Sequence, residues 1–508
     1  MSLQAQGTAQ SAKPREHSGG LLRLLRHTSN YSAGSLLITL ASIISFPVFT
    51  RTLTVAEYGV LGLVNVTLSL LVGIGKLGLQ QSVVRFYAEI ESGKRSGDRV
   101  TFFSTVLFSM LGVGTIASVL SAVAFLLMPG SWWGHDKAQY LIAAVSPLVL
   151  VRVVDSAMLN LLRAEQKSAF YSLYTVIRKY LGLAAVVLVL FTIARNLWGF
   201  FLATMVGEAI AVGFLVAHYA RQHVFSVSRV SRPLFLAMLG FGLPLLASEL
   251  SGLLLNMGGR YIINFQLGSR LLGSYSAAYN FCDYLQAVLT GAFAQAVVPM
   301  YLRMWESQGR ERTEAFLQRA LHYYLMLAFP VVAGMAAVAP DLLRLLASDR
   351  YSVSTSLFVY IVGGMLVAGG TPIFSAGIYI RKQTKVVMYS VLTTATVNLV
   401  LTALLTHRLG IEGAALATLC SLTLYAALTG IFGRATVTLR MPWVDFLKFA
   451  AMSGFMYVVL TRVQPESSVL RIVERIACGA LLYGVLLVLG DASVRSALGV
   501  GWRRLRGR

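Results

Sequence analysis

Long apolar stretches, separated by short polar segments, follow one another along almost the whole chain. Each stretch is roughly 20 residues long, which is the length that an α-helix needs to cross a bilayer. The pattern therefore predicts an all-α polytopic membrane protein with fourteen transmembrane helices. The expected spans are Tyr31–Arg51, Tyr58–Leu79, Val100–Met128, Ala138–Leu161, Ala169–Phe191, Asn196–Tyr219, Pro233–Gly259, Gly273–Pro299, Phe316–Val338, Ser354–Tyr379, Val386–Leu405, Ile411–Phe432, Trp443–Leu460 and Ile472–Leu489.

The composition supports a membrane protein. Apolar residues make up 56% of the 508 residues, whereas only 13% are charged, about half the share in soluble domains. These values exclude a disordered chain, a coiled coil and a nucleic-acid-binding domain. The three cysteines all lie inside apolar stretches, so neither a disulfide framework nor a zinc site is expected.

The net charge of +22 indicates the orientation of the chain in the membrane. Loops on the cytoplasmic side of membrane proteins are enriched in Lys and Arg. Most basic loop residues lie on the same side as the N-terminus, among them Lys94, Arg95, Arg303, Arg310 and Arg503. Because the predicted number of spans is even, both termini are expected to be cytoplasmic.

Similar motifs recur at nearly one spacing, which indicates an internal repeat. Leu53 and Gly59 match Leu267 and Gly273, each 214 positions later. Further matches join Arg163 to Arg381 and Gly199 to Gly413. Six spans separate the copies, so the halves are parallel, and such a repeat predicts two lobes around a cavity that opens by alternating access. The expected parts are a cytoplasmic N-terminal segment (1–30), two six-helix lobes (31–219 and 233–432) joined by a cytoplasmic linker (220–232), two additional helices (433–490) and a basic cytoplasmic tail (491–508).

Polar and charged side chains inside the spans mark candidate functional positions. A charge at the centre of a bilayer costs about 2.5–3.5 kcal/mol, so most of these groups are expected to face a cavity or one another. Asn65, Lys76 and Gln80 belong to one polar helical face of the second span, and Glu249, Asn256 and Arg260 belong to such a face in the seventh. The other charged candidates are Arg152 and Asp155 in span four, Arg178 in span five and Asp283 in span eight.

These residues divide into three expected roles. Arg152 and Asp155 lie three residues apart on one helix and are more easily explained as a structural pair, although both remain lumen candidates. Lys76, Arg178 and Arg260 have no obvious acid partner nearby in the sequence and are expected to bind an anionic substrate, together with Asn65, Gln80, Arg152 and Asn256. Glu249, Asp283 and Asp155 are candidates for a coupling ion. His322 is a weaker candidate for proton transfer. Neither a P-loop nor a metalloprotease motif occurs in the sequence, so we expect a protein that is not an enzyme, with no catalytic residue, metal or cofactor.

Several motifs resemble the polysaccharide-transport branch of the MOP exporter superfamily. The most specific is Asn398 followed by the stretch Gly410-Ile-Glu-Gly-Ala-Ala-Leu-Ala-Thr418. Further similar stretches are Arg51–Gly59, Gly78–Tyr87, Phe241–Pro244 and Gly259–Tyr279, and the resemblance covers roughly residues 30 to 435. One departure is Gly259, because an acidic residue often precedes the arginine that corresponds to Arg260.

The resemblance implies a Wzx-type flippase of the bacterial inner membrane. Such a protein moves undecaprenyl-pyrophosphate-linked oligosaccharides for polysaccharide, O-antigen or exopolysaccharide biosynthesis, through a cation-lined lumen between two lobes. The implied partners are the lipid-linked glycan, membrane lipids and the polysaccharide polymerase machinery. The two additional C-terminal spans resemble the fourteen-helix members of the superfamily.

Two other functions are open on the sequence. A multidrug/cation antiporter of the same superfamily should carry an acidic cation site in its first lobe, but the interiors of the first two spans contain neither Asp nor Glu. A glycan polymerase or ligase should carry a large external loop for its catalytic residues, and the polar segments between the spans are short.

Overall fold

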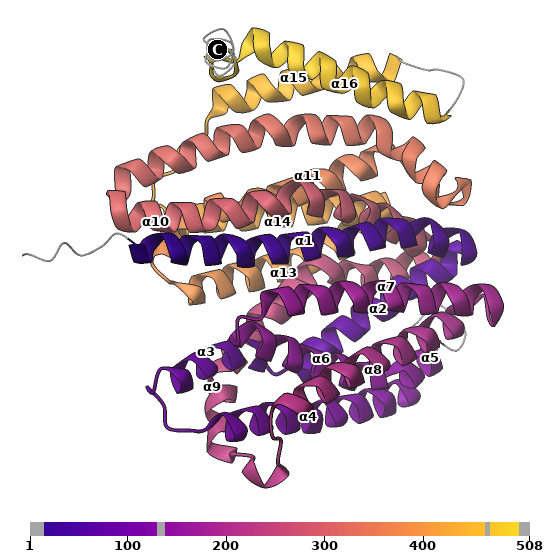
Figure 1. The fold of residues 1–508 in the computed structure, drawn as a ribbon. Helices are drawn as coiled ribbons and strands as arrows, with labels where there is room; N and C mark the ends of the chain where they lie inside the picture. Colours follow the sequence, from indigo (N-terminus) through magenta and orange to yellow (C-terminus); the bar gives the residue numbers. More distant parts are fainter. Residues whose placement is uncertain (1–14, 130–137, 463–467, 497–508) are drawn as a thin grey trace, which may run out of the picture.

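The protein forms an array of long helices (Figure 1). The computed structural model describes residues 15–129, 138–462 and 468–496, with side chains from Ser29 onward except at 138, 288–292, 294–295 and 468. The described residues contain no strand. The helices are α1 (Arg15–Thr52), α2 (Val55–Gly75), α3 (Leu79–Glu91), α4 (Arg99–Leu127), α5 (Ala138–Val145), α6 (Pro147–Ala164), α7 (Ser168–Thr192), α8 (Leu197–Gln222), α9 (Arg232–Leu253), α10 (Gly259–Ala347), α11 (Thr355–Phe374), α12 (Ala376–Ile380), α13 (Thr384–Leu409), α14 (Ile411–Gly433), α15 (Trp443–Arg462) and α16 (Ser468–Gly490).

Thirteen helical segments in the described part of the chain are long and apolar enough to cross a membrane. Two of them, Arg232–Ala287 and Ala296–Ala347, contain the predicted spans Pro233–Gly259 and Phe316–Val338 and overlap the two ends of a third, Gly273–Pro299. The backbone leaves the helical conformation at Gly268 (φ 82°) and Gly309 (φ 77°), and glycine tolerates these positive φ values. The chain therefore changes direction there without an intervening loop. The first helix begins at Arg15, well before the predicted start at Tyr31.

Polar caps define where several spans begin. Thr54 accepts a hydrogen bond from the Glu57 amide, and the Glu57 carboxylate accepts one from the Thr54 amide, which starts α2 with a capping box. Asn196 caps α8 in a similar way by accepting a hydrogen bond from the amide of Gly199. These caps satisfy backbone amides that the first turn of a helix leaves unpaired.

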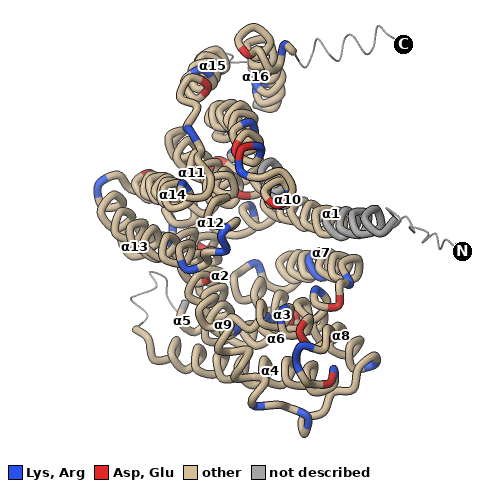
Figure 2. Tube along the Cα trace, turned by 90° about the vertical axis from the view of Figure 1, so that its left-hand side faces the viewer, with Lys and Arg blue, Asp and Glu red and all other residues tan. Residues whose placement is uncertain are grey.

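The helices form two lobes and a separate C-terminal hairpin. Helices α1–α8 build the first lobe, and α9–α14 build the second, with α1 lying at the boundary between them (Figure 1). Figure 2 looks along many of the helices and separates the hairpin α15–α16, at the top, from α4 and α8, at the bottom. The expected architecture of two six-helix lobes and two additional helices is thus confirmed.

The two lobes meet where α2 crosses α10, at a pair of glycines that the sequence repeat had matched. A Cβ atom at Gly59 would lie 2.1 Å from the carbonyl oxygen of Ser269, and one at Gly273 would lie 1.9 Å from that of Val55. Val55 and Ser269 are themselves 214 positions apart, so the contact is reciprocal. The two lobes are therefore related by a pseudo-two-fold axis at this crossing, and only glycine allows the backbones so close.

The C-terminal hairpin is fastened to α10 by polar contacts at both ends. At one end Lys448 donates hydrogen bonds to Asp445 (3.0 Å) and Asp491 (2.6 Å), and His322 of α10 lies 2.8 Å from Asp445. At the other end Arg475 binds Asp341 of α10 (2.9 Å). Burial opposes ionisation of Asp491, but the hydrogen bonds from Lys448 and from the Val494 amide lower its pKa to about 2. His322 thus belongs to this anchor.

The glycine crossing makes a specific prediction about stability. Replacing Gly59 with Ala places a methyl group against the Ser269 carbonyl, which is backbone and cannot rotate away. We expect Gly59→Ala to lower the thermal midpoint of the detergent-solubilised protein by several degrees. Gly112→Ala in α4, where a Cβ meets nothing within 4 Å, is the matched control and should leave the midpoint unchanged or slightly raised. Equal midpoints for the two variants would show that the crossing is not a tight contact.

Candidate functional site: the lumen cavity

A cavity of about 1310 Å³ lies between the two lobes. Helices α1, α2, α3, α6, α7 and α8 form its first-lobe wall, and α9 and α10 form the second-lobe wall. The ten residues that the sequence marked as candidates for substrate binding or ion coupling all line it, whereas His322 does not. They are Asn65, Lys76, Gln80, Arg152, Asp155, Arg178, Glu249, Asn256, Arg260 and Asp283.

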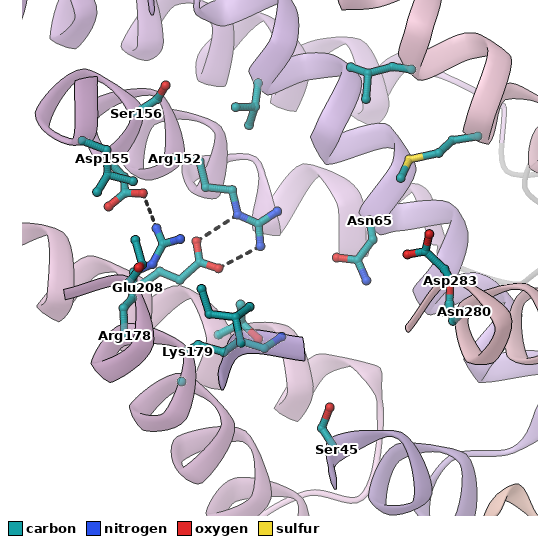
Figure 3. A pocket seen from close by; sticks show the side chains of 18 of the residues that line it. Ser45, Asn65, Arg152, Asp155, Ser156, Arg178, Lys179, Glu208, Asn280 and Asp283 are labelled. Carbon is teal, nitrogen blue, oxygen red and sulfur yellow. Dashed lines mark hydrogen bonds and ion pairs between the residues drawn. The ribbon is translucent and has the colours of Figure 1, made fainter. Parts of the chain in front are cut away.

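Two ion pairs cross between helices on the first-lobe wall (Figure 3). Arg152 of α6 donates two hydrogen bonds to Glu208 of α8, each of 2.9 Å. Arg178 of α7 pairs with Asp155 of α6, which also accepts a hydrogen bond from Tyr174 (2.8 Å). Because every one of these acids has its cation on another helix, the pairs fix α6, α7 and α8 to one another.

The expected pair between Arg152 and Asp155 is therefore wrong. The long Arg152 side chain reaches α8, whereas the short Asp155 carboxylate is already bound by Arg178 and Tyr174 from α7. The expectation that Arg178 has no acid partner is wrong for the same reason. Sequence spacing reveals neighbours on one helix, but it does not reveal which side chains face one another between helices.

Lys76 also has an acid partner, contrary to expectation. Its Nζ atom, just after the end of α2, lies 3.7 Å from Oε1 of Glu249 on α9. Gln80 of α3 donates a hydrogen bond of 2.5 Å to the other carboxylate oxygen. Glu249 thus connects the first helix of the second lobe to the first lobe.

Arg260 is held by neutral groups. It donates a hydrogen bond to Asn280 (3.1 Å) and lies over the ring of Tyr279, and none of the ion pairs among the described residues includes it. Asn280 in turn donates to Tyr58 of α2 (3.2 Å), which extends the connection to the first lobe. In the family that the sequence resembles, an acidic residue often precedes the arginine that corresponds to Arg260, and here that position is Gly259. The side-chain amide of Asn280 on α10 contacts Arg260 instead. Asp283, which also lines the cavity, has no ion pair within the described part of the chain.

Lys179 is a lumen cation that the choice of site residues missed. Its side chain extends from α7 into the cavity, close to Arg152 and Glu208 (Figure 3). No hydrogen bond or ion pair holds it among the residues that the structure describes. The signal was present in the sequence, because Lys179 is a charge within an apolar span, directly beside Arg178.

The cavity carries an excess of positive charge. Six basic and four acidic side chains line it. The basic residues are Lys76, Arg152, Arg163, Arg178, Lys179 and Arg260, and the acidic residues are Asp155, Glu208, Glu249 and Asp283. Three acids are each neutralised by a cation, so the excess resides on Lys179, Arg260 and Arg163, with Arg163 hydrogen-bonded to Tyr171. Such a field attracts anions.

The comparison with known families agrees with this geometry. Residues 48–356 match the model of a family described as "Polysaccharide biosynthesis protein". The chain belongs to this family. The resemblance to a family of polysaccharide biosynthesis is thereby confirmed.

Two curated relatives match nearly the whole chain. The succinoglycan biosynthesis transport protein ExoT of Rhizobium meliloti (strain 1021) is 22% identical over 468 residues, covering 89% of this chain and 90% of the relative. The probable low-salt glycan biosynthesis flippase Agl15 of Haloferax volcanii is 19% identical over 454 residues, covering 87% and 90%. Both names refer to glycan biosynthesis, and neither name describes an enzyme.

Solved structures share the fold. The lipid II flippase MurJ in an inward closed conformation superposes with a TM-score of 0.73 and 16% identity, covering 92% of this chain and 99% of that one. An outward-facing multidrug resistance transporter of the MATE family, also of the MOP superfamily, gives a TM-score of 0.52 and 16% identity, covering 81% and 94%. The chain is a multi-pass membrane protein with this transporter fold.

The Arg152–Glu208 pair generates a testable prediction. Removing one partner leaves the other charge unpaired in the lumen, whereas removing both leaves neither. We expect Arg152→Ala and Glu208→Ala each to lower the thermal midpoint in detergent, and the double variant to lie nearer to wild type than the sum of the two changes predicts. The corresponding coupling is about 1–3 kcal/mol. Strictly additive changes would show that the pair contributes nothing.

Proposed function

We propose that this protein is a flippase that moves a lipid-linked anionic oligosaccharide across the bacterial inner membrane. The observation that carries the proposal is the positively charged cavity between the two lobes, with Lys179 of α7 and Arg260 of α10, which have no ion pair among the described residues, on opposite walls. A pyrophosphate headgroup loses its hydration on leaving water, and charge-assisted hydrogen bonds from such cations offset that loss. The names of the glycan-transporting relatives support the same substrate class.

The arrangement of lobes and charges suits transport by alternating access. The headgroup and sugars would occupy the cavity, while the polyprenyl chain stays in the lipid. With both termini in the cytoplasm, as the distribution of basic residues favours, export moves negative charge outward. An inside-negative potential assists this step by about 2.3 kcal/mol per charge per 100 mV.

Coupling to an ion is not required, but Asp283 is the candidate for it, since Asp155 and Glu249 are already paired. Delivery of the glycan to a polymerase follows from this function.

The multidrug/cation antiporter remains the alternative, but the charges disfavour it. A cationic drug needs an available acid, and three of the four lumen acids are bound to cations. The fourth, Asp283, shares its cavity with an excess of positive charge. We therefore assign the main substrate contacts to Lys179 and Arg260. Further contacts come from Lys76, Arg178 and the side-chain amides of Asn65, Gln80 and Asn256. Arg152 has a structural role.

Substitution of the unpaired cations tests the proposal. Losing one charge-assisted contact costs about 1.5–3 kcal/mol, so Lys179→Ala and Arg260→Ala should each reduce glycan export about tenfold or more at limiting substrate. Surface glycan of a deletion strain complemented with each variant is the measurement, with membrane protein levels checked in parallel. Arg260→Lys should retain partial export, because the charge remains while the planar fork is lost.

Lys385→Ala is the matched control, because this lysine is exposed and lies outside the cavity. It should export at the wild-type rate. Wild-type export by both Lys179→Ala and Arg260→Ala would contradict a cation-dependent lumen, and loss of the variants from the membrane would assign the two residues a structural role instead.

A further inference from the structure

Glu249 is bound as an anionic ligand would be. Its two carboxylate oxygens face two donors from the other lobe, Nζ of Lys76 at 3.7 Å and Nε2 of Gln80 at 2.5 Å. An ammonium and an amide that converge on the two oxygens of one carboxylate form a suitable site for any oxyanion. Lys76 and Glu249 are only about one-fifth to one-quarter exposed, and that exposure faces the cavity.

This pair differs from the other two in the lumen. Arg152 and Glu208 are joined by two hydrogen bonds of 2.9 Å, and Asp155 is held by both Arg178 and Tyr174. The 3.7 Å separation between Lys76 and Glu249 lies beyond hydrogen-bond distance, so the lysine keeps donor capacity that its partner does not use. It is therefore the pair that an incoming anion can open at the smallest cost.

Glu249 also lies between two irregular points of its helix. Pro244 interrupts the hydrogen-bond ladder of the helix one turn before it, and a π-helical turn, Leu254–Gly258, follows directly after α9. Before this region, α9 packs closely on the first lobe, where Gly242 meets Gly78. After it, Gly258 contacts Leu399 of the second lobe. The carboxylate thus sits where the chain passes from one lobe to the other.

We propose that Glu249 acts as a built-in substitute for the substrate anion. In the substrate-free lumen it occupies the oxyanion site of Lys76 and Gln80, and a phosphate or carboxylate oxygen of the lipid-linked glycan displaces it. The exchange releases Glu249 of α9 from Lys76 and Gln80 of the first lobe, so substrate binding loosens a connection between the lobes that otherwise holds the empty transporter in one state. This inference rests on the proposed function, because it takes the ligand to be the anionic substrate.

The test compares oxyanion affinities of the purified full chain in detergent, with inorganic pyrophosphate as the probe of a lipid phosphate and glucuronate as the probe of an acidic sugar. Glu249→Gln removes the competing charge and should bind one of the probes about tenfold more tightly than wild type, within the usual range of coupling between sites. Asp283→Asn is the matched control. It removes a lumen acid that has no ion pair among the described residues and does not contact Lys76 or Gln80, so it reports the effect of losing a lumen charge elsewhere and should give a smaller gain.

A second comparison identifies Lys76 as the group that is released. In a Lys76→Ala background, Glu249→Gln should no longer increase the affinity, because the freed donor is absent. Should Glu249→Gln prove poorly folded, Glu249→Ala replaces it in both comparisons. A gain no larger than that of Asp283→Asn, or a gain that persists without Lys76, would overturn the inference.

The outcomes also separate the inference from the proposed function. If wild type and Asp283→Asn bind a probe while Glu249→Gln gains nothing further, the lumen binds anions but Glu249 does not compete, and only the inference fails. If none of the proteins, Glu249→Gln included, binds either probe, the anionic substrate of the proposed function fails as well. Binding by Glu249→Gln alone would be the strongest support for displacement.

Discussion

A charge inside a membrane must be paired or placed against water, and the arrangement of this lumen follows from that constraint. Ten charged side chains line one cavity, and three acids find their cations on other helices. These pairs position the walls of the cavity. They also consume most of the negative charge, so the cations that remain, Lys179 and Arg260 above all, give the cavity its preference for anions. The same constraint that stabilises the helices thus creates the site.

The two lobes line this cavity and meet at a crossing where their backbones come very close. Gly59 and Gly273 let α2 and α10 cross with their backbones almost touching, and the reciprocal contacts follow the sequence repeat. This crossing lies on the pseudo-two-fold axis that relates the lobes. Polar side chains add further connections between the lobes, among them the hydrogen bonds from Gln80 to Glu249 and from Asn280 to Tyr58.

Much of the fold could be predicted from the sequence, because the bilayer imposes a strong pattern. The lengths of the apolar stretches predicted where the spans lie, and the match of Gly59 with Gly273 indicated the repeat. The polar faces identified residues that line the cavity, but their partners could not be predicted, since Glu208 and Arg152 are 56 positions apart and meet only when α6 packs on α8. Lys179 could have been identified, since it is a charge within an apolar span, but Gly268 and Gly309 gave no sign that the chain changes direction there without a loop.

The most direct test of the account is transport by the purified protein. Undecaprenyl-pyrophosphate-linked oligosaccharide is incorporated into proteoliposomes, and the fraction of glycan that an externally added glycosidase can reach is followed over time. The account predicts that wild-type protein makes the inner pool accessible, and that liposomes containing the Lys179→Ala/Arg260→Ala double variant keep it protected, as protein-free liposomes do. Protection of the inner pool in wild-type proteoliposomes, or equal exposure by the double variant, would contradict a cation-lined lumen that carries lipid-linked glycan.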